Sequence, residues 1–469
     1  MISFVKLREK SIKIVSKLSF FILEKTCVTG IVLLEYVCYR KGGFNMGTMK
    51  FALHMLKADF KRNLFYCGSL IFSTIVVFVF FNMTTNPNLG GDPTGVSSSF
   101  TTVLSMIVGV IAMVMAFFAN SYYLSGKSKE LAIESLSGGS VLTLANYLLT
   151  QNTVIMLIAI PLGLGIGYLC IPLINSYLYA QLRVIDDVWK IYPTGFWMTI
   201  VSLTTEMFWL VLVDTGYAYR TEITSLISAE QQMNSRKGKM ISNIPDFVYV
   251  ILYMVPVAIF ILTEANATVY LVASCLGLFG VSGLLNYTIP NLLNKLTRKK
   301  LLTHKHKIIS VGNLNYSLRQ STTLIQMVII SAVFLVCFMC IYFKDPEQLI
   351  LVLMSYIVLT FLMAVSIAYK VIIEANVRKK SFRHLKMIGY VTSDLKRIIR
   401  QEVTGLYSVI VLFPVVYLLI IFIKFIQTGM MTLTFAVGVI LFYVIIFFFA
   451  GIISYFLYKQ TILKGKKGR

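Results

Sequence analysis

Two acidic side chains lie inside an otherwise apolar stretch, where an ionisable group is costly. Glu206 and Asp214 belong to the segment from Phe196 to Tyr217, which is long enough to cross a membrane as a helix. Two helical turns separate them, so both can lie near one helix face. Such groups usually face the protein interior or a watery path, and contact with a substrate or a proton is one interpretation. The alternative is a structural contact with another helix or, for Asp214, nearness to the cytoplasmic interface.

A second kind of candidate site occurs twice, in polar stretches that share one pattern. Basic residues are followed by an amphipathic stretch, then by Gly, then by Ser140 or Thr392, which can cap the next helix. Such a segment offers apolar side chains and charge to another protein. The candidate contact residues are Lys129, Glu130, Leu131, Leu136 and Gly138 in the first stretch, and Phe382, Leu385, Met387 and Gly389 in the second.

The two stretches align when Gly138 is placed on Gly389. Leu131 then matches Phe382, and Leu136 matches Met387. Any cytoplasmic connector can be basic and helical, and this is the simpler interpretation. The recurrence at matching places in two similarly built parts of the chain favours a specific contact.

The elements that must position these residues are ten apolar segments separated by short polar connectors. Because 57% of residues are hydrophobic and 13% are charged, the bilayer is the main solvent. The sequence therefore predicts an all-α, polytopic membrane protein. The segments are Leu64 to Met83, Thr101 to Tyr123, Leu149 to Ile174, Phe196 to Tyr217, Val248 to Leu262, Val269 to Tyr287, Thr323 to Tyr342, Leu349 to Tyr369, Tyr407 to Ile423 and Met431 to Leu457.

The net charge of +23 is read as a sign of topology and not of nucleic-acid binding. Lys and Arg gather in alternate connectors, as the positive-inside rule requires of cytoplasmic loops. The opposite connectors carry only Arg183, Lys190, Lys344 and Lys424. Both ends of the chain are therefore predicted to face the cytoplasm.

Motifs for catalysis or cofactors are not convincing in this chain. Gly126-Lys127-Ser128 ends like a phosphate-binding loop, but position 121 holds Ser where that loop needs Gly. His304 and His306 lie among lysines, without neighbouring carboxylates or thiols, which fits a lipid-facing stretch better than a metal site. We therefore expect no enzymatic activity, no metal and no cofactor, and the energy for any transport must come from a partner or an ion gradient.

Residues 1–45 do not fit the pattern of the rest. Their apolar stretch carries Glu24, Lys25 and Glu35, each costly within a membrane. Lys41-Gly42-Gly43 can be encoded as a ribosome-binding sequence ahead of Met46, so translation is predicted to begin there. A peripheral amphipathic tail is the alternative. The remaining predicted parts are a first four-helix unit at 46–217, a linker with two helices at 218–300 and a second four-helix unit at 301–469.

The polar motif and the helix plan resemble one known family. The order basic residue, Glu, apolar pair, Leu, Gly, small residue around Glu130 to Gly138 is similar to the cytoplasmic motif of FtsX-like ABC transporter permeases. Two four-helix units joined by two helices resemble the bacitracin-export type of that family. The resemblance implies a bacterial cytoplasmic membrane protein whose two polar stretches dock a partner ATPase, with two copies per chain. It also implies export or expulsion of a peptide or a lipid-like antimicrobial compound.

The chain also departs from that family. Ser381 stands where Glu is usual, Glu134 and Ser137 stand where apolar residues are common, and only Phe343 to Gln348 stands where the type has a large external domain. Capture of wall-bound antibiotics is thus not predicted. Two other functions stay open: an ATPase-driven signalling protein that contacts a sensor kinase, and an ion-coupled carrier that uses Glu206. Membrane lipid is an expected partner in every case.

Overall fold

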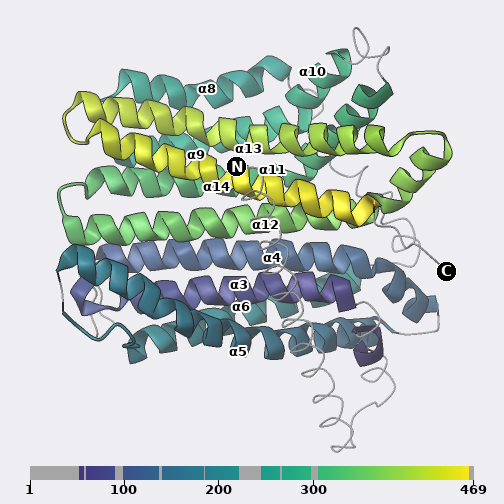
Figure 1. The fold of residues 1–469 in the computed structure, drawn as a ribbon, viewed down its shortest axis with the longest axis horizontal. Helices are drawn as coiled ribbons and strands as arrows, with labels where there is room; N and C mark the ends of the chain where they lie inside the picture. Colours follow the sequence, from purple (N-terminus) through teal and green to yellow (C-terminus); the bar gives the residue numbers. More distant parts are fainter. Residues whose placement is uncertain are drawn as a thin grey trace, which may run out of the picture. The chain divides into compact units, whose positions relative to one another are not determined.

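The computed structural model describes residues 52–56, 60–89, 99–136, 140–183, 185–220, 245–264, 267–296 and 305–463. Within these ranges the chain is helical and contains no strand, and Figure 1 traces the order of the helices. The long elements are α3 (Phe60–Thr84), α4 (Ser99–Leu136), α5 (Val141–Leu182), α6 (Pro193–Arg220), α8 (Asp246–Leu262), α9 (Ala267–Gly283), α11 (Lys305–Ile341), α12 (Pro346–Met387), α13 (Thr392–Gln427) and α14 (Leu433–Leu463). Three short elements are η1 (Pro87–Leu89), the π-helix η3 (Leu284–Thr288) and α10 (Ile289–Leu296).

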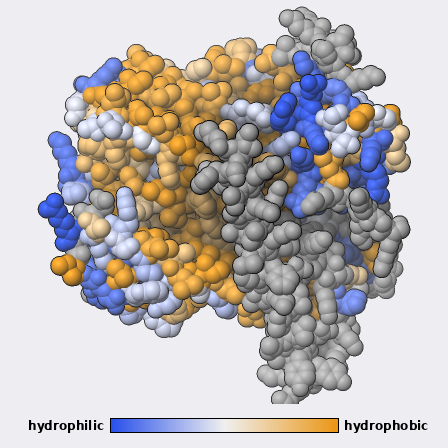
Figure 2. All heavy atoms as spheres, in the orientation of Figure 1, coloured by the Kyte–Doolittle hydropathy of each residue, from blue (hydrophilic) through white to orange (hydrophobic). Residues whose placement is uncertain are grey.

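The prediction of an all-α polytopic membrane protein is confirmed. Nine helical stretches of the described ranges are long and apolar enough to cross a membrane, and one of them runs from α9 through η3 into α10. The helix α8 has 17 residues and is shorter. On the face drawn in Figure 2, hydrophobic side chains cover the middle of the long helices and hydrophilic ones gather toward their ends. A surface of this kind is stable when hydrocarbon surrounds it.

Several helices continue well beyond the predicted apolar segments. α4 continues to Leu136, α11 begins at Lys305 and α12 continues to Met387. Lys, Arg and Glu are good helix formers, so nothing in these polar extensions ends the helix where the apolar segment ends. The candidate polar stretches are therefore the ends of long helices and not separate short helices.

Contacts between residues divide the chain into two compact units. Unit 1 contains Met1–Ile75, Ala116–Cys170 and Ile200–Ala229, and unit 2 contains Val76–Met115, Ile171–Thr199 and Glu230–Arg469. The divisions fall inside α3, α4, α5 and α6. They do not test the sequence boundaries at 217 and 300, which stay predictions.

Within unit 2, α11 packs against α13, α12 and α9, while α14 packs against α12 and α13. Figure 1 shows α11, α12, α13 and α14, coloured from green to yellow, running along one another. The connector between α11 and α12 is short, because α11 ends at Ile341 and α12 begins at Pro346. No external domain stands at this place in the chain.

Close packing of α8 on α9 depends on glycine. Gly277, Gly280 and Gly283 repeat every three residues along α9 and face α8. A Cβ at Gly280 would overlap the backbone of Tyr253 and lie 2.8 Å from the carbonyl carbon of Leu252. Small residues at such a crossing let two helix backbones approach closely in a membrane.

Replacing Gly280 by valine is therefore expected to separate α8 from α9 and to lower stability by about 1–3 kcal/mol, the usual cost of overpacking. Thermal unfolding of the purified protein in detergent measures the effect. Gly438 is the matched control, because a Cβ there meets no atom within 4 Å. Equal unfolding midpoints for the Gly280→Val and Gly438→Val variants would contradict this account of the crossing.

Candidate functional site

The second polar stretch forms the end of α12 and the turn into α13. Gly389 has a φ of +105°, a backbone conformation that a side chain makes unfavourable. The Tyr390 N–H donates to the carbonyl oxygen of Leu385 at 3.1 Å, and the Gly389 N–H donates to that of Lys386 at 3.2 Å. These bonds form a Schellman turn, so Gly389 ends the helix as the sequence predicted.

The predicted cap of the next helix is not where we placed it. Thr392 is the first residue of α13, and the N-cap position belongs to Val391, whose side chain cannot accept a hydrogen bond. The Asp394 carboxylate instead accepts from the Val391 N–H at 3.3 Å. An acid in the first helical turn satisfies the exposed backbone donors and leaves Thr392 free of that role.

The candidate contact residues of this stretch face in opposite directions. Phe382 is buried and packs edge-on against Tyr458 of α14, with ring centroids 6.2 Å apart. Leu385 is half-buried. Met387 and the neighbouring Ile388 are 68% and 76% exposed. Phe382 thus supports the helix end from inside, while Met387 and Ile388 form its apolar outer surface.

Four buried charges lie roughly two and a half to five helical turns from this end, and we call them the α12 charge cluster: Lys370, Glu374, Arg378 and Glu402. The first three follow one face of α12, and Glu402 comes from α13. Lys370 Nζ lies 2.6 Å from Glu374, and the Arg378 guanidinium pairs with both glutamates. The four formal charges cancel.

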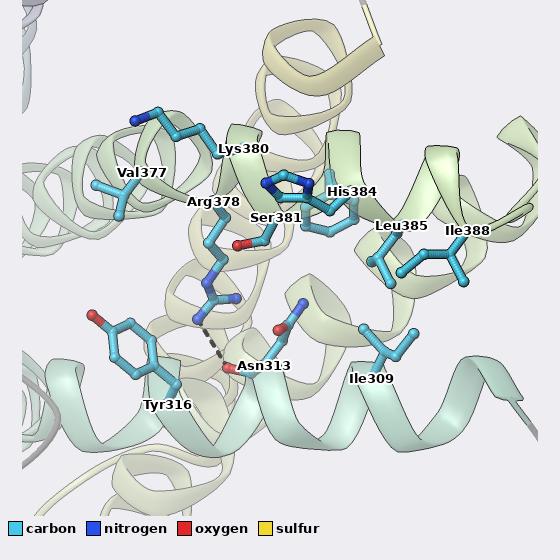
Figure 3. Close-up of a pocket in the computed structure, with 11 residues that line it drawn as sticks. Ile309, Asn313, Tyr316, Val377, Arg378, Lys380, Ser381, His384, Leu385 and Ile388 are labelled. Carbon is cyan, nitrogen blue, oxygen red and sulfur yellow. Dashed lines mark hydrogen bonds between the residues drawn. The ribbon is translucent and has the colours of Figure 1, made fainter. Parts of the chain in front are cut away.

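Polar groups of two more helices complete the α12 charge cluster. From α11, Ser317 donates to Glu374 at 2.6 Å, and the Asn313 backbone oxygen accepts from Arg378 at 3.1 Å (Figure 3). From α14, the Tyr458 hydroxyl donates to Glu402 at 3.2 Å. The cluster therefore ties α11, α12, α13 and α14 together.

Sequence reasoning missed the α12 charge cluster because its lysine and arginine were read as loop charges that report topology. The signal was present: Lys370, Glu374 and Arg378 have the four-residue spacing of helical ion pairs. Glu402 could not have been added from the sequence, since its contact with Arg378 bridges two helices.

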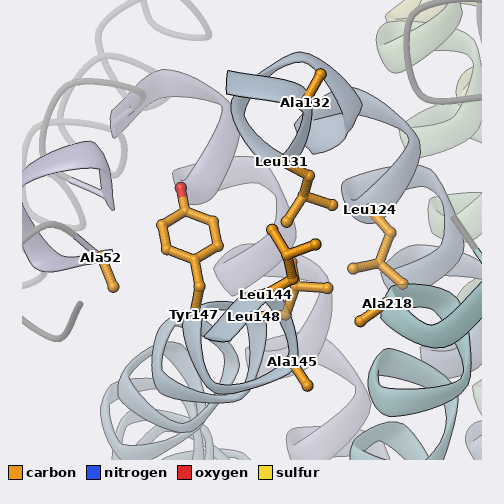
Figure 4. Packing of buried hydrophobic residues seen from close by; sticks show 9 residues of the cluster. All are labelled: Ala52, Leu124, Leu131, Ala132, Leu144, Ala145, Tyr147, Leu148 and Ala218. Atoms are coloured by element: carbon orange, nitrogen blue, oxygen red, sulfur yellow. The ribbon is translucent and has the colours of Figure 1, made fainter. Parts of the chain in front are cut away.

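The first polar stretch forms the end of α4 in unit 1. Leu131 is fully buried, and Figure 4 shows it among apolar side chains of α5 and α6. As a core residue, Leu131 holds the helix end in place and offers no surface to a partner. Its neighbours in the core are Ala52, Leu124, Ala132, Leu144, Ala145, Tyr147, Leu148 and Ala218.

Glu130 joins the end of α4 to α5. Its carboxylate accepts from Lys127 Nζ at 2.7 Å and from the Tyr147 hydroxyl at 2.6 Å. Ser140 caps α5 as predicted, because its Oγ accepts from the Thr143 N–H at 3.3 Å. Glu130 thus has a structural role in its own chain.

Three residues of the first stretch carry no further description. Lys129 and Leu136 belong to α4, but their side chains lie outside the described residues, as does Gly138 altogether. The alignment of Gly138 with Gly389 stays a prediction.

Asp214 is fully buried in unit 1 and is held by two amides. Asn120 donates to its Oδ1 at 2.6 Å, and Asn152 donates to its Oδ2. The Tyr66 hydroxyl donates to Asn120 Oδ1 at 3.2 Å. These contacts join α6 to α4 and α5, so the structural interpretation of Asp214 has direct support.

Glu206 differs from Asp214 although both are buried on α6. Within the described residues, its carboxyl group has neither a hydrogen bond nor an ion pair. The bulky apolar residues around it, such as Phe208 and Trp209, are exposed as expected for a lipid-facing surface. Glu206 therefore keeps both of its interpretations, and the structure does not bring it into a site with other acids or bases.

Comparison with known proteins gives one partial relative. No protein-family model matches the chain. It is 28% identical over 181 residues to a protein of Bacillus subtilis (strain 168) described as the uncharacterized ABC transporter permease YvcS. The match covers 38% of this chain and 28% of that protein, so the chain spans well under half of its relative. Over that part, this polytopic membrane protein is similar to a permease.

Proposed function

We propose that this chain is the membrane-spanning permease subunit of an ABC-type transporter, driven by a separate ATPase. The observation that carries the proposal is the end of α12, where Met387 and Ile388 present apolar surface amid basic side chains. The positive-inside rule assigns this helix end to the cytoplasm. Exposed apolar surface there is of the kind that another protein covers. The partial similarity to a permease supports the same conclusion.

In unit 2, the proposed docking surface is the outer side of the α12–α13 turn. Met387, Ile388 and Val391 are exposed there, and the Gly389 turn fixes their direction. Phe382 and Leu385 support this surface from behind. A few exposed apolar anchors surrounded by charge are typical of the residues that dominate binding at protein interfaces.

In unit 1, the proposed docking surface is built in the same way. Ile133, Val141 and Leu142 are exposed at the end of α4 and the start of α5, and Leu142 is 73% exposed. Leu131 occupies the supporting position that Phe382 occupies in the second unit. Because the chain has two such surfaces, one permease is expected to bind two copies of the ATPase.

Cargo is proposed from the family resemblance alone. A peptide or a lipid-like antimicrobial compound, exported or expelled, fits a protein whose helices expose apolar surface to the bilayer. The short connector between α11 and α12 favours a route from within the membrane over capture by an external domain.

The proposal is tested by affinity purification of the chain from its native membrane, followed by identification and counting of the subunits. We expect an ATPase at two copies per chain. Recovery of the chain alone, under conditions that keep other membrane complexes intact, would contradict the proposal and favour an ion-coupled carrier.

Glu206 is buried and has no hydrogen bond or ion pair in the part of the chain that the structure describes, and this observation favours a carrier. Under our proposal, Glu206→Gln has nearly the same shape and is expected to change ATP-dependent transport by less than about twofold. A carrier that loads a proton at Glu206 would lose that step almost entirely, by tenfold or more. Transport assayed in vesicles, with protein amount measured in parallel, separates the two functions.

A further inference from the structure

Asp214 is a buried carboxylate that no basic side chain balances. It lies fully buried on α6, and each of its two oxygens accepts from an amide N–H, an arrangement that suits the ionised form. Within the described residues, Asp214 belongs to no ion pair. Lys127, about two turns beyond Asn120 on α4, pairs with Glu130 at 2.7 Å instead. A lone charge inside a membrane protein is costly, so an ionised Asp214 attracts a cation.

The corresponding part of unit 2 supplies its own cation. In the α12 charge cluster, Lys370 pairs with Glu374 at 2.6 Å. The predicted alignment of the two polar stretches, continued back along the helices without a gap, places Ala119 at the position of Lys370. Ala119 directly precedes Asn120, which donates to Asp214 at 2.6 Å. Unit 1 therefore lacks a basic side chain close to the place where it has an unbalanced carboxylate.

Amide oxygens lie beside this carboxylate. Asn152 of α5 is 3% exposed, and its Nδ2 donates to Asp214 Oδ2 and, at 3.1 Å, to Asn120 Oδ1. The Oδ1 of Asn152 belongs to the same amide group and is buried without a hydrogen-bond partner. A half-turn of the terminal bond exchanges the oxygen and the nitrogen of an amide. Both asparagines can therefore turn an oxygen toward an ion that is bound at Asp214.

The kind of ion follows from these groups. Carboxylate and amide oxygens are ligands of hard metal cations, and a single carboxylate balances one positive charge. We propose that Asp214, Asn120 and Asn152 bind an alkali-metal cation, either sodium or potassium. A site with one carboxylate and two amides does not match the His, Cys and acid motifs of metal sites, so it was not predicted from the sequence.

The bound ion joins α4, α5 and α6 near one side of the membrane. Asn120 lies four residues before Leu124, where the span of α4 ends, and Asp214 lies five residues before Tyr219, where that of α6 ends. The positive-inside rule places both ends at the cytoplasm, so the ion enters from there. The site does not require the proposed ATPase. Its test is run on the full-length chain alone, and its failure would leave the proposed function untouched.

The experiment measures cation binding by the purified full-length chain in detergent. Thermal unfolding is compared in sodium, potassium and N-methylglucamine chloride at equal ionic strength, and radioactive sodium and rubidium, a tracer for potassium, count the bound ions. We expect a metal ion far above its dissociation constant to raise the unfolding midpoint by about 3 °C over N-methylglucamine. Tracer binding should saturate at one ion per chain. Equal midpoints in all three salts, or a midpoint that responds to pH alone, would overturn the proposal.

The variant Asp214→Asn keeps the shape of the side chain and removes its charge. We expect it to weaken tracer binding more than tenfold and to abolish the difference between the salts. Its midpoint in N-methylglucamine should equal or exceed that of the unchanged chain, because a buried unpaired charge is gone. A carboxylate with a structural role alone would instead lower the midpoint equally in every salt, and this result would overturn the site.

Two further variants complete the test. Asn152→Ala removes the unpartnered amide oxygen and is expected to weaken tracer binding about tenfold. It also decides the question, together with the salts on the unchanged chain, if Asp214→Asn does not fold. Glu206→Gln is the matched control, because Glu206 is a buried carboxyl of the same helix without contacts to these amides. It should bind one ion as before, and loss of the ion in this control would place the site elsewhere and overturn the proposal.

Discussion

Replacing Arg378 by alanine is expected to lower the free energy of unfolding by about 3–5 kcal/mol. The change leaves Glu374 and Glu402 buried and facing each other without the guanidinium that pairs with both. An uncompensated buried charge is among the largest single destabilising effects. Denaturation of the purified chain in mixed detergent micelles, or the yield of folded protein, measures the loss.

Arg400→Ala is the matched control for this prediction. Arg400 is exposed on α13 and belongs to no ion pair within the described residues, so its loss should change stability by less than about 0.5 kcal/mol. The double variant Arg378→Met with Glu402→Leu removes one charge of each sign and keeps the pair of Lys370 and Glu374. It should be more stable than Arg378→Ala. A double variant at least as unstable as the single one would show that the cluster does not act through charge balance.

Substituting Met387 and Ile388 together by aspartate is expected to release the proposed ATPase from the permease. Each exposed anchor at an interface typically contributes about 2 kcal/mol, so the pair should weaken binding more than a hundredfold. Because both side chains are largely exposed, at 68% and 76%, the permease itself should fold as before. Copurification and ATPase activity in the membrane are the measurements.

The turn between α13 and α14 is the control, because it too has a glycine with a positive φ and exposed apolar residues beside it. Gly429 also has a positive φ there, 69°, and Met430 and Leu433 are exposed beside it. Aspartate at these two positions alters apolar surface at the opposite ends of the helices and should leave the ATPase bound. Full recovery of ATPase with the Met387 and Ile388 variant, or equal loss with the control, would refute docking at the α12–α13 turn.

The sequence predicted the membrane helices well because their signal is local. An apolar run needs no partner to be recognised, and seven of the ten predicted segments lie wholly within one helix of the structure. Of the others, Val269 to Tyr287 continues from α9 into η3, Tyr342 follows the end of α11, and Met431 precedes the start of α14. Gly389 was likewise predictable, since the end of a helix depends on the backbone of that residue. The true lengths of α4 and α12 were not predicted, because polar side chains that suit a loop suit a helix equally well.

The directions of side chains at the candidate docking ends could not be read from the sequence. The predicted alignment pairs Leu131 with Phe382, and both side chains are buried. Their burial depends on neighbours from other helices, such as Tyr458 of α14 for Phe382. An amphipathic pattern identifies an apolar face but does not reveal whether the same chain or a partner covers it.

The unbroken course of α12 has a mechanical consequence. Its 42 residues make a rod about 63 Å long, roughly twice the thickness of the hydrocarbon core. Arg378, where the rod is held by three other helices, lies about 14 Å from Met387 and about 48 Å from Pro346. A rod that pivots at this point works as an unequal lever. A push of 1 Å at its short arm, where a nucleotide-driven motor would press, becomes a sweep of about 3 Å at the far side of the membrane.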